Sequence, residues 1–442
     1  MRRSLSIRLL LLSCLLHPLL GCGGGPRAAV MEAVEHRNVR QALVRYERFR
    51  DEEGPDGRLL APVAGLILQE EAGGEDAERS RAAIGQLALA GSPGQPVLER
   101  LATGGQSVGI RARALGALAR RGDRSALDAL RALLDDEDSE VLAAAVVSLD
   151  PEEDVDRLIT LLTHTAGDVR KSAARQLSGS TPIGRARASL AEAARVDPLP
   201  DVRATAVRSL GNYGGAVFES LRERLSDADS GVRMAAVGAL VRADRERALS
   251  AIGPLLEMTP SRAGIEAARV LADVPADAEP AEGAVLARAF LRRALSAGEV
   301  ETRSQAAVAL SSLPVDPGLE QALLQALESE EEPRVRLSLA LGLHRREAVR
   351  GKAERALTAL LEDEGMPGVQ AASLLAKGGD RDALRHLARA LRRGEPLIRR
   401  VAARAMAREA LRPDAARRAL RDEDALVRIH AAGGILAASS SL

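Results

Sequence analysis

Aromatic side chains are rare in this sequence. They make up 1% of the residues and tryptophan is absent, although 46% of the chain is apolar. The apolar residues are therefore mostly alanine, leucine and valine, and alanine and leucine are strong helix formers. A mainly β fold would need more aromatic and β-branched side chains. The composition predicts helices that pack closely through small residues.

Lysine is almost missing as well. Lys171, Lys352 and Lys377 are the only lysines, so nearly all positive charge is arginine. The 62 basic and 62 acidic residues cancel, so no overall excess of charge indicates a nucleic-acid-binding protein. At 442 residues the chain exceeds the size at which one compact core keeps growing, and it must form several domains or one extended array.

Both cysteines lie in the first 22 residues. Basic residues at positions 2, 3 and 8 precede an apolar run over 9–16, which is too short to cross a bilayer and is typical of a signal peptide. The Leu-Leu-Gly-Cys at 19–22 resembles the lipobox of bacterial lipoproteins. The resemblance implies that Cys22 is acylated and becomes the mature N-terminus, with a diacylated glycerol as a stable anchor. The alternative is a plain secretory signal with two incidental cysteines.

The lipobox reading divides the N-terminal region. We expect a signal peptide over 1–21 and a lipidated cysteine with a glycine-rich tether over 22–26. Gly23 occupies the position where, in enteric bacteria, an aspartate would indicate retention in the inner membrane. We therefore expect an outer-membrane protein that faces the periplasm. Its mature chain would hold no free thiol and no disulfide.

One pattern recurs through most of the chain. Val202-Arg203, then Ala206 and Leu210, is repeated in copies whose arginines are Arg170, Arg233, Arg303, Arg336, Arg399 and Arg428. Weaker copies near residues 81, 111, 141, 264 and 369 fill the gaps at steps of about 28–34 residues, with one longer step before Arg303. Twelve copies cover 72–438.

Each copy has helical periodicity. Val202, Ala206 and Leu210 are four residues apart and line one helix face, and a second amphipathic segment precedes each copy. Neither helix can bury its apolar face alone, so neighbouring pairs must stack. The sequence predicts an all-α superhelix, or solenoid, of about twelve helical-hairpin repeats, drawn out as a rod or arc on the order of 100 Å long.

Three segments fall outside the pattern. We expect 27–71 to be a helical hairpin that caps the exposed end of the array. Two prolines in 272–284 predict an insertion loop, which could be a bend between two halves or a surface loop. A short tail occupies 439–442.

The repeat resembles the HEAT family, and in particular its short bacterial subtype known from bilin lyases. Gly122-Asp123-Arg124-Ser125-Ala126 and Asp201-Val202-Arg203 carry this resemblance. It implies that the acid before the valine, as in Asp168 and Asp201, caps the second helix. It also implies that the arginines form a structural ladder between repeats, namely Arg170, Arg203, Arg233, Arg336, Arg399 and Arg428.

Catalytic and metal-binding patterns are missing from the sequence. No two histidines after the signal segment are three or four residues apart, no His-Glu pair of HEAT-like di-iron hydroxylases occurs, and no nucleophile elbow or P-loop is found. The few aromatic residues are scattered, unlike the base-stacking set of HEAT-like DNA glycosylases. We expect no enzyme, no cofactor and no metal; a lyase-type enzyme on a HEAT-like scaffold is one alternative.

Charge is unevenly distributed along the chain. Residues 135–156 hold ten acids and no base, whereas 381–421 hold thirteen arginines and four acids. The candidate anion- or partner-binding residues are on two predicted helices, Arg385, Arg389, Arg392 and Arg393 on one and Arg400 and Arg404 on the other. They are either a solvated face with ladder pairs or a module that binds an anion, namely an acidic protein, lipid head groups or anionic wall polymer.

The sequence therefore predicts a lipid-anchored scaffold at the bacterial cell envelope. Its concave surface, built mainly from the second helices, would bind one or more protein partners through many shallow contacts. We expect no nucleic acid and no small-molecule substrate as a partner.

Overall fold

The computed structural model describes residues 25–104, 107–179, 184–273, 282–314, 317–409 and 412–440. The expected signal peptide, Cys22 and most of the glycine-rich tether lie outside these residues. Within them the chain is helical and contains no strand, which confirms the all-α prediction. No helix in this part of the chain combines the length and apolarity that crossing a bilayer requires.

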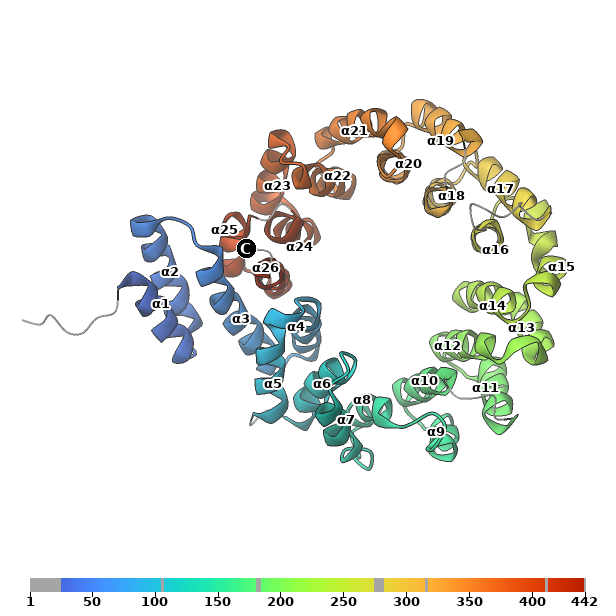
Figure 1. Cartoon of the computed structure of the whole chain (residues 1–442), viewed down its shortest axis with the longest axis horizontal. Coiled ribbons are helices and arrows are strands. Elements are labelled where there is room, and N and C mark those ends of the chain that lie inside the picture. Colours follow the sequence, from blue (N-terminus) through green and yellow to red (C-terminus); the bar gives the residue numbers. More distant parts are fainter. Residues whose placement is uncertain are drawn as a thin grey trace, which may run out of the picture.

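Twenty-four of the helices alternate between two layers, shown in Figure 1. The outer layer contains α3 (Gly57–Gly73), α5 (Gln95–Thr103), α7 (Arg124–Arg131), α9 (Val155–Leu161), α11 (Gly184–Val196), α13 (Phe218–Glu223), α15 (Arg245–Glu257), α17 (Glu282–Ala294), α19 (Pro317–Ser329), α21 (Arg350–Ala359), α23 (Arg381–Arg393) and α25 (Pro413–Ala416). The inner layer contains α4 (Ala77–Leu89), α6 (Val108–Ala119), α8 (Ser139–Ala145), α10 (Gly167–Gln176), α12 (Pro200–Leu210), α14 (Ser230–Ala243), α16 (Arg262–Ala272), α18 (Val300–Ser312), α20 (Pro333–His344), α22 (Met366–Lys377), α24 (Pro396–Arg404) and α26 (Ala425–Ala438).

Each outer helix and the inner helix that follows it form one repeat, and we number the repeats 1 to 12 in chain order. The predicted number of about twelve repeats is therefore confirmed. All twelve copies of the sequence pattern lie on inner helices or at their first turn. Their valines and alanines, such as Val202 and Ala206, are buried against the outer layer.

Neighbouring inner helices approach each other closely. A Cβ added to Gly211, which follows α12, would lie 2.9 Å from the Cα of Ala239 on α14. Small residues on the inner layer allow its helices to lie close together. The longer side chains of the outer layer keep the outer helices farther apart. Wedge-shaped repeats of this kind produce a curved stack.

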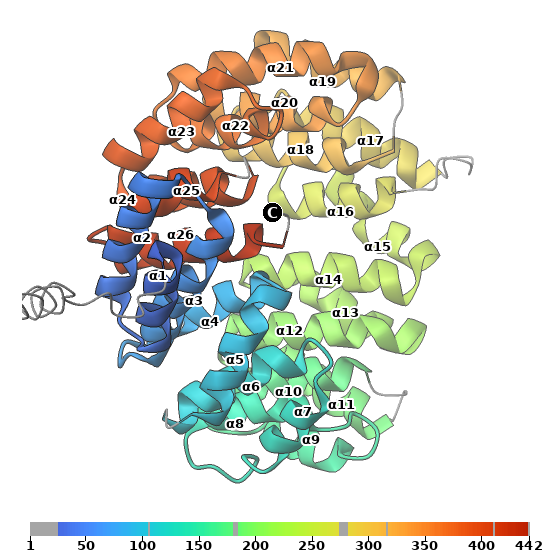
Figure 2. The same cartoon turned by 60° about the vertical axis from the view of Figure 1, so that its left-hand side comes forward.

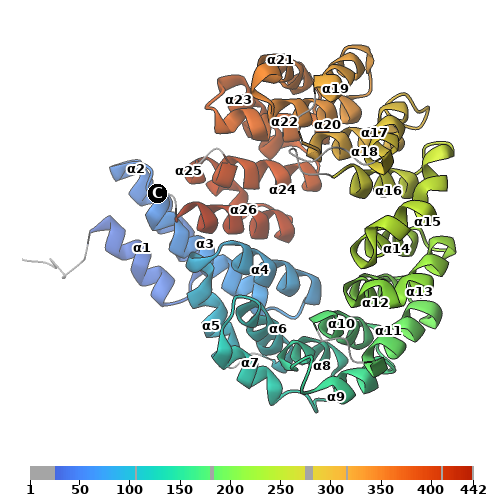
Figure 3. The same cartoon turned by 45° about the vertical axis from the view of Figure 1, so that its right-hand side comes forward.

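The curvature brings the two ends of the array together, so the solenoid is a closed ring and not the expected rod or arc (Figures 1–3). Helix α26 of repeat 12 packs against α3 and α4 of repeat 1. A Cβ added to Gly433 would lie 2.7 Å from the Cβ of Gln86, so these helices are also in close contact. Arg428 Nη2 donates to Glu71 Oε1 over 2.5 Å. We call this contact between repeats 12 and 1 the seal.

The two helices of the seal are apolar on nearly all sides. Six consecutive residues of α3, Val63 to Leu68, are buried and point in all directions around the helix, and the consecutive residues Ala431 to Leu436 of α26 are buried in the same way. A helix without a polar face must be surrounded by protein. One hydrophobic cluster accordingly contains residues from both ends of the chain.

The segment expected to form a capping hairpin contains three helices. Helices α1 (Pro26–Glu35) and α2 (Val39–Glu53) form a hairpin outside the ring, while α3 belongs to repeat 1. The hairpin covers the outer side of the seal, where Tyr46 is buried and its hydroxyl lies 3.2 Å from a carboxylate oxygen of Asp414. Arg417 Nε donates to Glu47 over 3.2 Å.

The expected insertion loop over 272–284 lies between α16 and α17. Residues 274–281 of it are outside the described part of the chain. Of the expected tail, Ser439 and Ser440 are described and directly follow α26.

The Arg428–Glu71 pair predicts a specific weakness at the seal. Arg428→Glu places a second carboxylate beside half-buried Glu71, so we expect a loss of about 1–3 kcal/mol of stability and faster amide hydrogen exchange in α3, α4 and α26. Exchanging both charges, Arg428→Glu with Glu71→Arg, should restore slow exchange.

Arg203→Glu is the matched control, because Arg203 makes a comparable ion pair far from the seal. It should increase exchange around α12 and α14 and leave α26 protected. Equal exchange in α26 for native protein and Arg428→Glu would contradict the role given to this pair.

Candidate functional site

The ladder arginines lie at the start of the inner helices and reach the next repeat. Arg170 Nε donates to Asp197 Oδ2 over 2.7 Å and Nη2 to Oδ1 over 3.0 Å. Its Nη1 donates to the carbonyl of His164 over 2.8 Å. The pair is almost fully buried, and the hydrogen bonds from Arg170 to Asp197 raise the pKa of the guanidinium. Such a planar two-bond contact fixes one repeat against the next.

The same arrangement recurs around the ring. It joins Arg203 to Asp227, Arg303 to Glu330 and Arg399 to Asp422, always between consecutive repeats. Each acid stands five residues before the valine that begins the repeated pattern in its own repeat, as Asp227 does before Val232. It also accepts a hydrogen bond from the backbone N–H two residues further on, as Asp227 does from Asp229. Arg428 completes the ladder at the seal with Glu71, a residue of α3.

Two predicted ladder arginines make only the hydrogen bonds to backbone carbonyls, and within the described residues neither is paired with an acid of the next repeat. Arg233 and Arg336 donate to carbonyls of the preceding turn, at Asp227 and Glu330 respectively. In the repeat after Arg233 the acid position is occupied by Met258, whose side chain cannot accept these bonds.

The predicted capping role of Asp168 and Asp201 is wrong. Both lie in the first turn of their helices, but α10 and α12 have no side-chain cap. Asp201 instead pairs with Lys171 of the previous repeat over 2.8 Å. In repeats that are capped by an acid, such as those with Asp138 and Asp229, the cap stands three residues before the valine, because its carboxylate must reach the N–H groups of the first turn.

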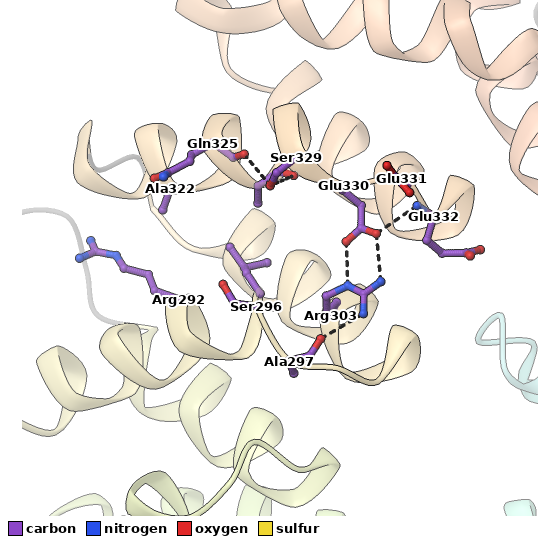
Figure 4. A pocket seen from close by; sticks show the side chains of 12 residues that line it. Arg292, Ser296, Ala297, Arg303, Ala322, Gln325, Ser329, Glu330, Glu331 and Glu332 are labelled. Atoms are coloured by element: carbon purple, nitrogen blue, oxygen red, sulfur yellow. Dashed lines mark hydrogen bonds and ion pairs between the residues drawn. The ribbon is translucent and has the colours of Figure 1, made fainter.

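A groove of about 910 Å³ lies beside the ladder between repeats 8 and 9. Figure 4 shows Arg303 and Glu330 facing each other within it, with Arg292 and Ser296 on one side and Gln325 on the other. Ser329, also in its lining, donates to backbone carbonyls of α19. No hydroxyl of this lining is hydrogen-bonded to a histidine or a carboxylate, so the groove offers no activated nucleophile.

A second groove, of about 590 Å³, occupies the corresponding place between repeats 4 and 5. The Arg170–Asp197 pair lines it together with Ile159, Leu162 and Val196. The grooves are thus a consequence of how successive repeats stack, and each contains one ladder pair, Arg303–Glu330 or Arg170–Asp197.

The six arginines proposed for anion binding are not brought together. Arg385, Arg389, Arg392 and Arg393 are exposed on outer helix α23, whereas Arg400 and Arg404 belong to inner helix α24. Arg385 pairs with Asp382, Arg389 lies 3.9 Å from Glu364, and Arg400 pairs with Asp424. Among the described residues Arg392, Arg393 and Arg404 have no acidic partner.

Most acids of the 135–156 stretch have structural contacts. Asp135, Asp154 and Asp156 form ion pairs with Arg157, Arg131 and Arg185. Asp138 caps α8, and Glu140 accepts two hydrogen bonds from Arg113, which lower its pKa. This stretch is therefore mainly a set of caps and ion pairs.

The histidines are far apart in the ring. His164, His344, His386 and His430 lie in repeats 4, 9, 11 and 12, and burial lowers the pKa of His386 and of His430. Within the described ranges no three His, Cys, Asp or Glu side chains are placed to hold a metal ion.

The inner helices form a continuous surface around the inside of the ring (Figure 1). Val308 on α18 and Leu397 on α24 are each 57% exposed on it. Arginines near the ends of inner helices, among them Arg175, Arg208, Arg242 and Arg404, are exposed there too. Sequence reasoning did not single out the first three, because they fall outside the Arg-rich C-terminal stretch.

Comparison with known families identifies the repeat. The profile described as HEAT repeats matches residues 67–150, 95–179 and 187–272. These residues are HEAT repeats. The same helix pairs continue to α26, and HEAT arrays are helical scaffolds for protein interaction. No curated protein matches the chain in sequence.

Solved structures of other repeat proteins are similar at low identity. The Escherichia coli protein YibA is 18% identical, covers 64% of this chain and 92% of its own, and has a TM-score of 0.30. The CpcE–CpcF phycocyanin lyase complex of Nostoc is 18% identical, with coverages of 67% and 92% and a TM-score of 0.28. Kap121p is 14% identical, with coverages of 86% and 50% and a TM-score of 0.38. Scores this low carry no argument about function.

The ladder predicts a pH-dependent contribution to stability. Hydrogen bonds from Arg303 hold the pKa of Glu330 below its ordinary value, so the pair stabilises the fold above the unfolded pKa of about 4.3 and is lost as the pH falls through the lower folded value. We expect Glu330→Gln to cost about 1–3 kcal/mol at neutral pH, and the difference from native protein to shrink below about pH 4.

Urea unfolding at both pH values measures this difference. Glu331→Gln, at the exposed neighbour of Glu330, is the control and should change stability little at either pH. A pH-independent effect of Glu330→Gln would show that the ion pair is not its cause.

Proposed function

We propose that this protein is a lipid-anchored, non-catalytic ring that holds protein partners on its inner surface at the bacterial cell envelope. The observation that carries the proposal is the inner surface itself, to which one helix of every repeat contributes. Many shallow contacts distributed over such a surface can bind a protein without any single pocket. In each groove an arginine and an acid of the lining are bound to each other in the ladder, which favours a scaffold over an enzyme.

The lipobox-like residues support the anchor. If Cys22 carries the lipid, only three residues link it to Pro26 at the start of α1, and they span at most about 11 Å. Helix α1 lies outside the ring (Figure 2). An anchor there would hold the outer side of the seal against a membrane, which in this proposal is the outer membrane, and leave the inner surface open to the periplasm.

The exposed arginines of α23 support a second candidate function. Repeat 11 is next to repeat 12, on which the α1–α2 hairpin packs, so Arg385, Arg389, Arg392 and Arg393 lie on the anchored half of the ring. In this alternative they bind anionic lipid head groups or wall polymer and orient the ring on the surface that holds it.

The anchor predicts a specific labelling result. Cells grown with a fatty-acid probe should label the native chain at Cys22, and Cys22→Ala should abolish the label and release the protein from the membrane fraction. Cys14→Ala is the matched control and should leave the label unchanged, because residue 14 lies in the expected signal peptide. Label that persists in Cys22→Ala refutes the anchor.

The scaffold predicts which surface captures a partner. Tagged, lipidated protein from solubilised envelope should retain a defined protein, identified by mass spectrometry. Replacing the exposed inner residues with Val308→Glu and Leu397→Glu should abolish retention, because a charge on each disrupts an apolar contact.

Val196→Glu and Leu286→Glu change residues on the outer helices α11 and α17 that are 51% and 48% exposed. This matched pair should leave capture unchanged. Loss of capture with the outer pair alone would place the binding surface on the outside of the ring and contradict the proposal.

A further inference from the structure

Three arginines lie side by side on the inner surface of consecutive repeats. Arg175 is in the last turn of α10, Arg208 in the last turn of α12, and Arg242 near the end of α14. All three are exposed. We call them the inner arginine cluster.

Hydrogen bonds from side chains to backbone carbonyls join these neighbouring helix ends. Ser209 Oγ donates to the carbonyl of Ala174 over 2.7 Å, which places the residue after Arg208 next to the residue before Arg175. Arg242 Nη2 donates to the carbonyl of Arg208 over 3.2 Å and lies against Gly211, where a Cβ would be 3.1 Å away. The close approach at Gly211 therefore brings Arg242 directly beside Arg208.

The cluster is not neutralised within the described part of the chain. None of its three arginines forms an ion pair there; Arg208 donates only to the hydroxyl of Thr205. The nearby acids have other roles, since Asp201 pairs with Lys171 and Asp244 caps α15. Partial burial of its guanidinium, and then the charge of nearby Arg208, lower the pKa of Arg242, while the charge of Asp201 acts on Arg208.

This contrasts with the ladder, where Arg170 and Arg203 of the same helices have buried carboxylates as partners. The helix dipole favours a cation at each C-terminus. A bound anion would in addition reduce the repulsion between Arg208 and Arg242.

The spacing of the cluster limits the shape of that anion. Packed helices are about 8–10 Å apart, so the three helices that carry these arginines follow one another at that step. A polyproline II segment has three residues per turn and rises about 3.1 Å per residue, so every third side chain points the same way about 9 Å from the last. Carboxylates at every third residue of such a segment match this step.

We propose that the inner arginine cluster binds an extended acidic segment of a partner protein, with a carboxylate at every third residue, that crosses α10, α12 and α14 on the inside of the ring. This inference rests on the proposed function and names the chemistry of one part of the inner surface.

Fluorescence anisotropy of labelled peptides tests the proposal with the full-length, lipidated protein in neutral detergent. The probe is a peptide of repeated Glu-Pro-Pro units. Its comparison peptide has the same length and composition, with the glutamates at alternate positions in one half and the remaining prolines in the other. We expect the first to bind about tenfold more tightly at low ionic strength, because only its glutamates can reach three arginines at once.

Arg175→Glu, Arg208→Glu and Arg242→Glu together should weaken binding of the Glu-Pro-Pro peptide at least about tenfold, since each exposed ion pair contributes up to about fivefold. The three Arg→Gln changes remove the charge with less risk to folding and should also weaken binding. Arg385→Glu, Arg389→Glu and Arg392→Glu, an equal charge change on outer helix α23, should leave binding within about twofold.

The proposal is overturned if the inner arginine variant binds the Glu-Pro-Pro peptide as tightly as native protein does. It is also overturned if the α23 variant loses as much affinity as the inner arginine variant, or if native protein binds both peptides equally. Capture from the envelope distinguishes it from the scaffold itself. Suppose that the inner arginine variant still retains the partner and the Val308 and Leu397 variant loses it. This result overturns the proposal that an acidic segment binds the inner arginine cluster, but leaves the scaffold function standing. Failure of capture by native protein, with peptide binding intact, contradicts the proposed function instead.

Discussion

No helix pair in this chain can bury its apolar face by itself, and a linear stack of such pairs always leaves two uncovered ends. Open solenoids cover these ends with repeats that have a polar outer face. Here the first and last repeats have no such face. Helices α3 and α26 are buried on nearly all sides, and each is the surface that covers the other. The contact between repeats 12 and 1 is therefore as much a part of the core as any contact within the array.

Much of the fold follows from sequence periodicity. The spacing of Val202, Ala206 and Leu210, repeated twelve times, predicts the inner helices, because burial on one face imposes a helical period. Arg170, Arg203 and Arg399 were recognised as ladder residues through the resemblance of the repeat to the HEAT family. The ladder acids were missed, although Asp197 and Asp227 stand at a constant five residues before a valine.

Closure could not be derived from the repeat, since curvature depends on small differences in spacing between the two layers. A signal did exist in single helices. Residues 59–68 and 425–438 lack the polar face that a terminal helix needs, and Gly433 allows the close contact with Gln86. The prediction that 27–71 forms a cap assumed an open array, so the apolar run over 59–68 of α3 was not recognised as a surface that covers the other end.

Closure also limits how a partner can occupy the inner surface. An open superhelix adapts to a partner by flexing, because each repeat contacts only its neighbours. In a ring the last neighbour of repeat 12 is repeat 1, so widening strains every interface together, including the buried ion pairs from Arg170 to Asp197 and from Arg399 to Asp422. A segment that is already extended needs no such widening. An extended chain is therefore the kind of occupant that the ring can accept without breaking its seal.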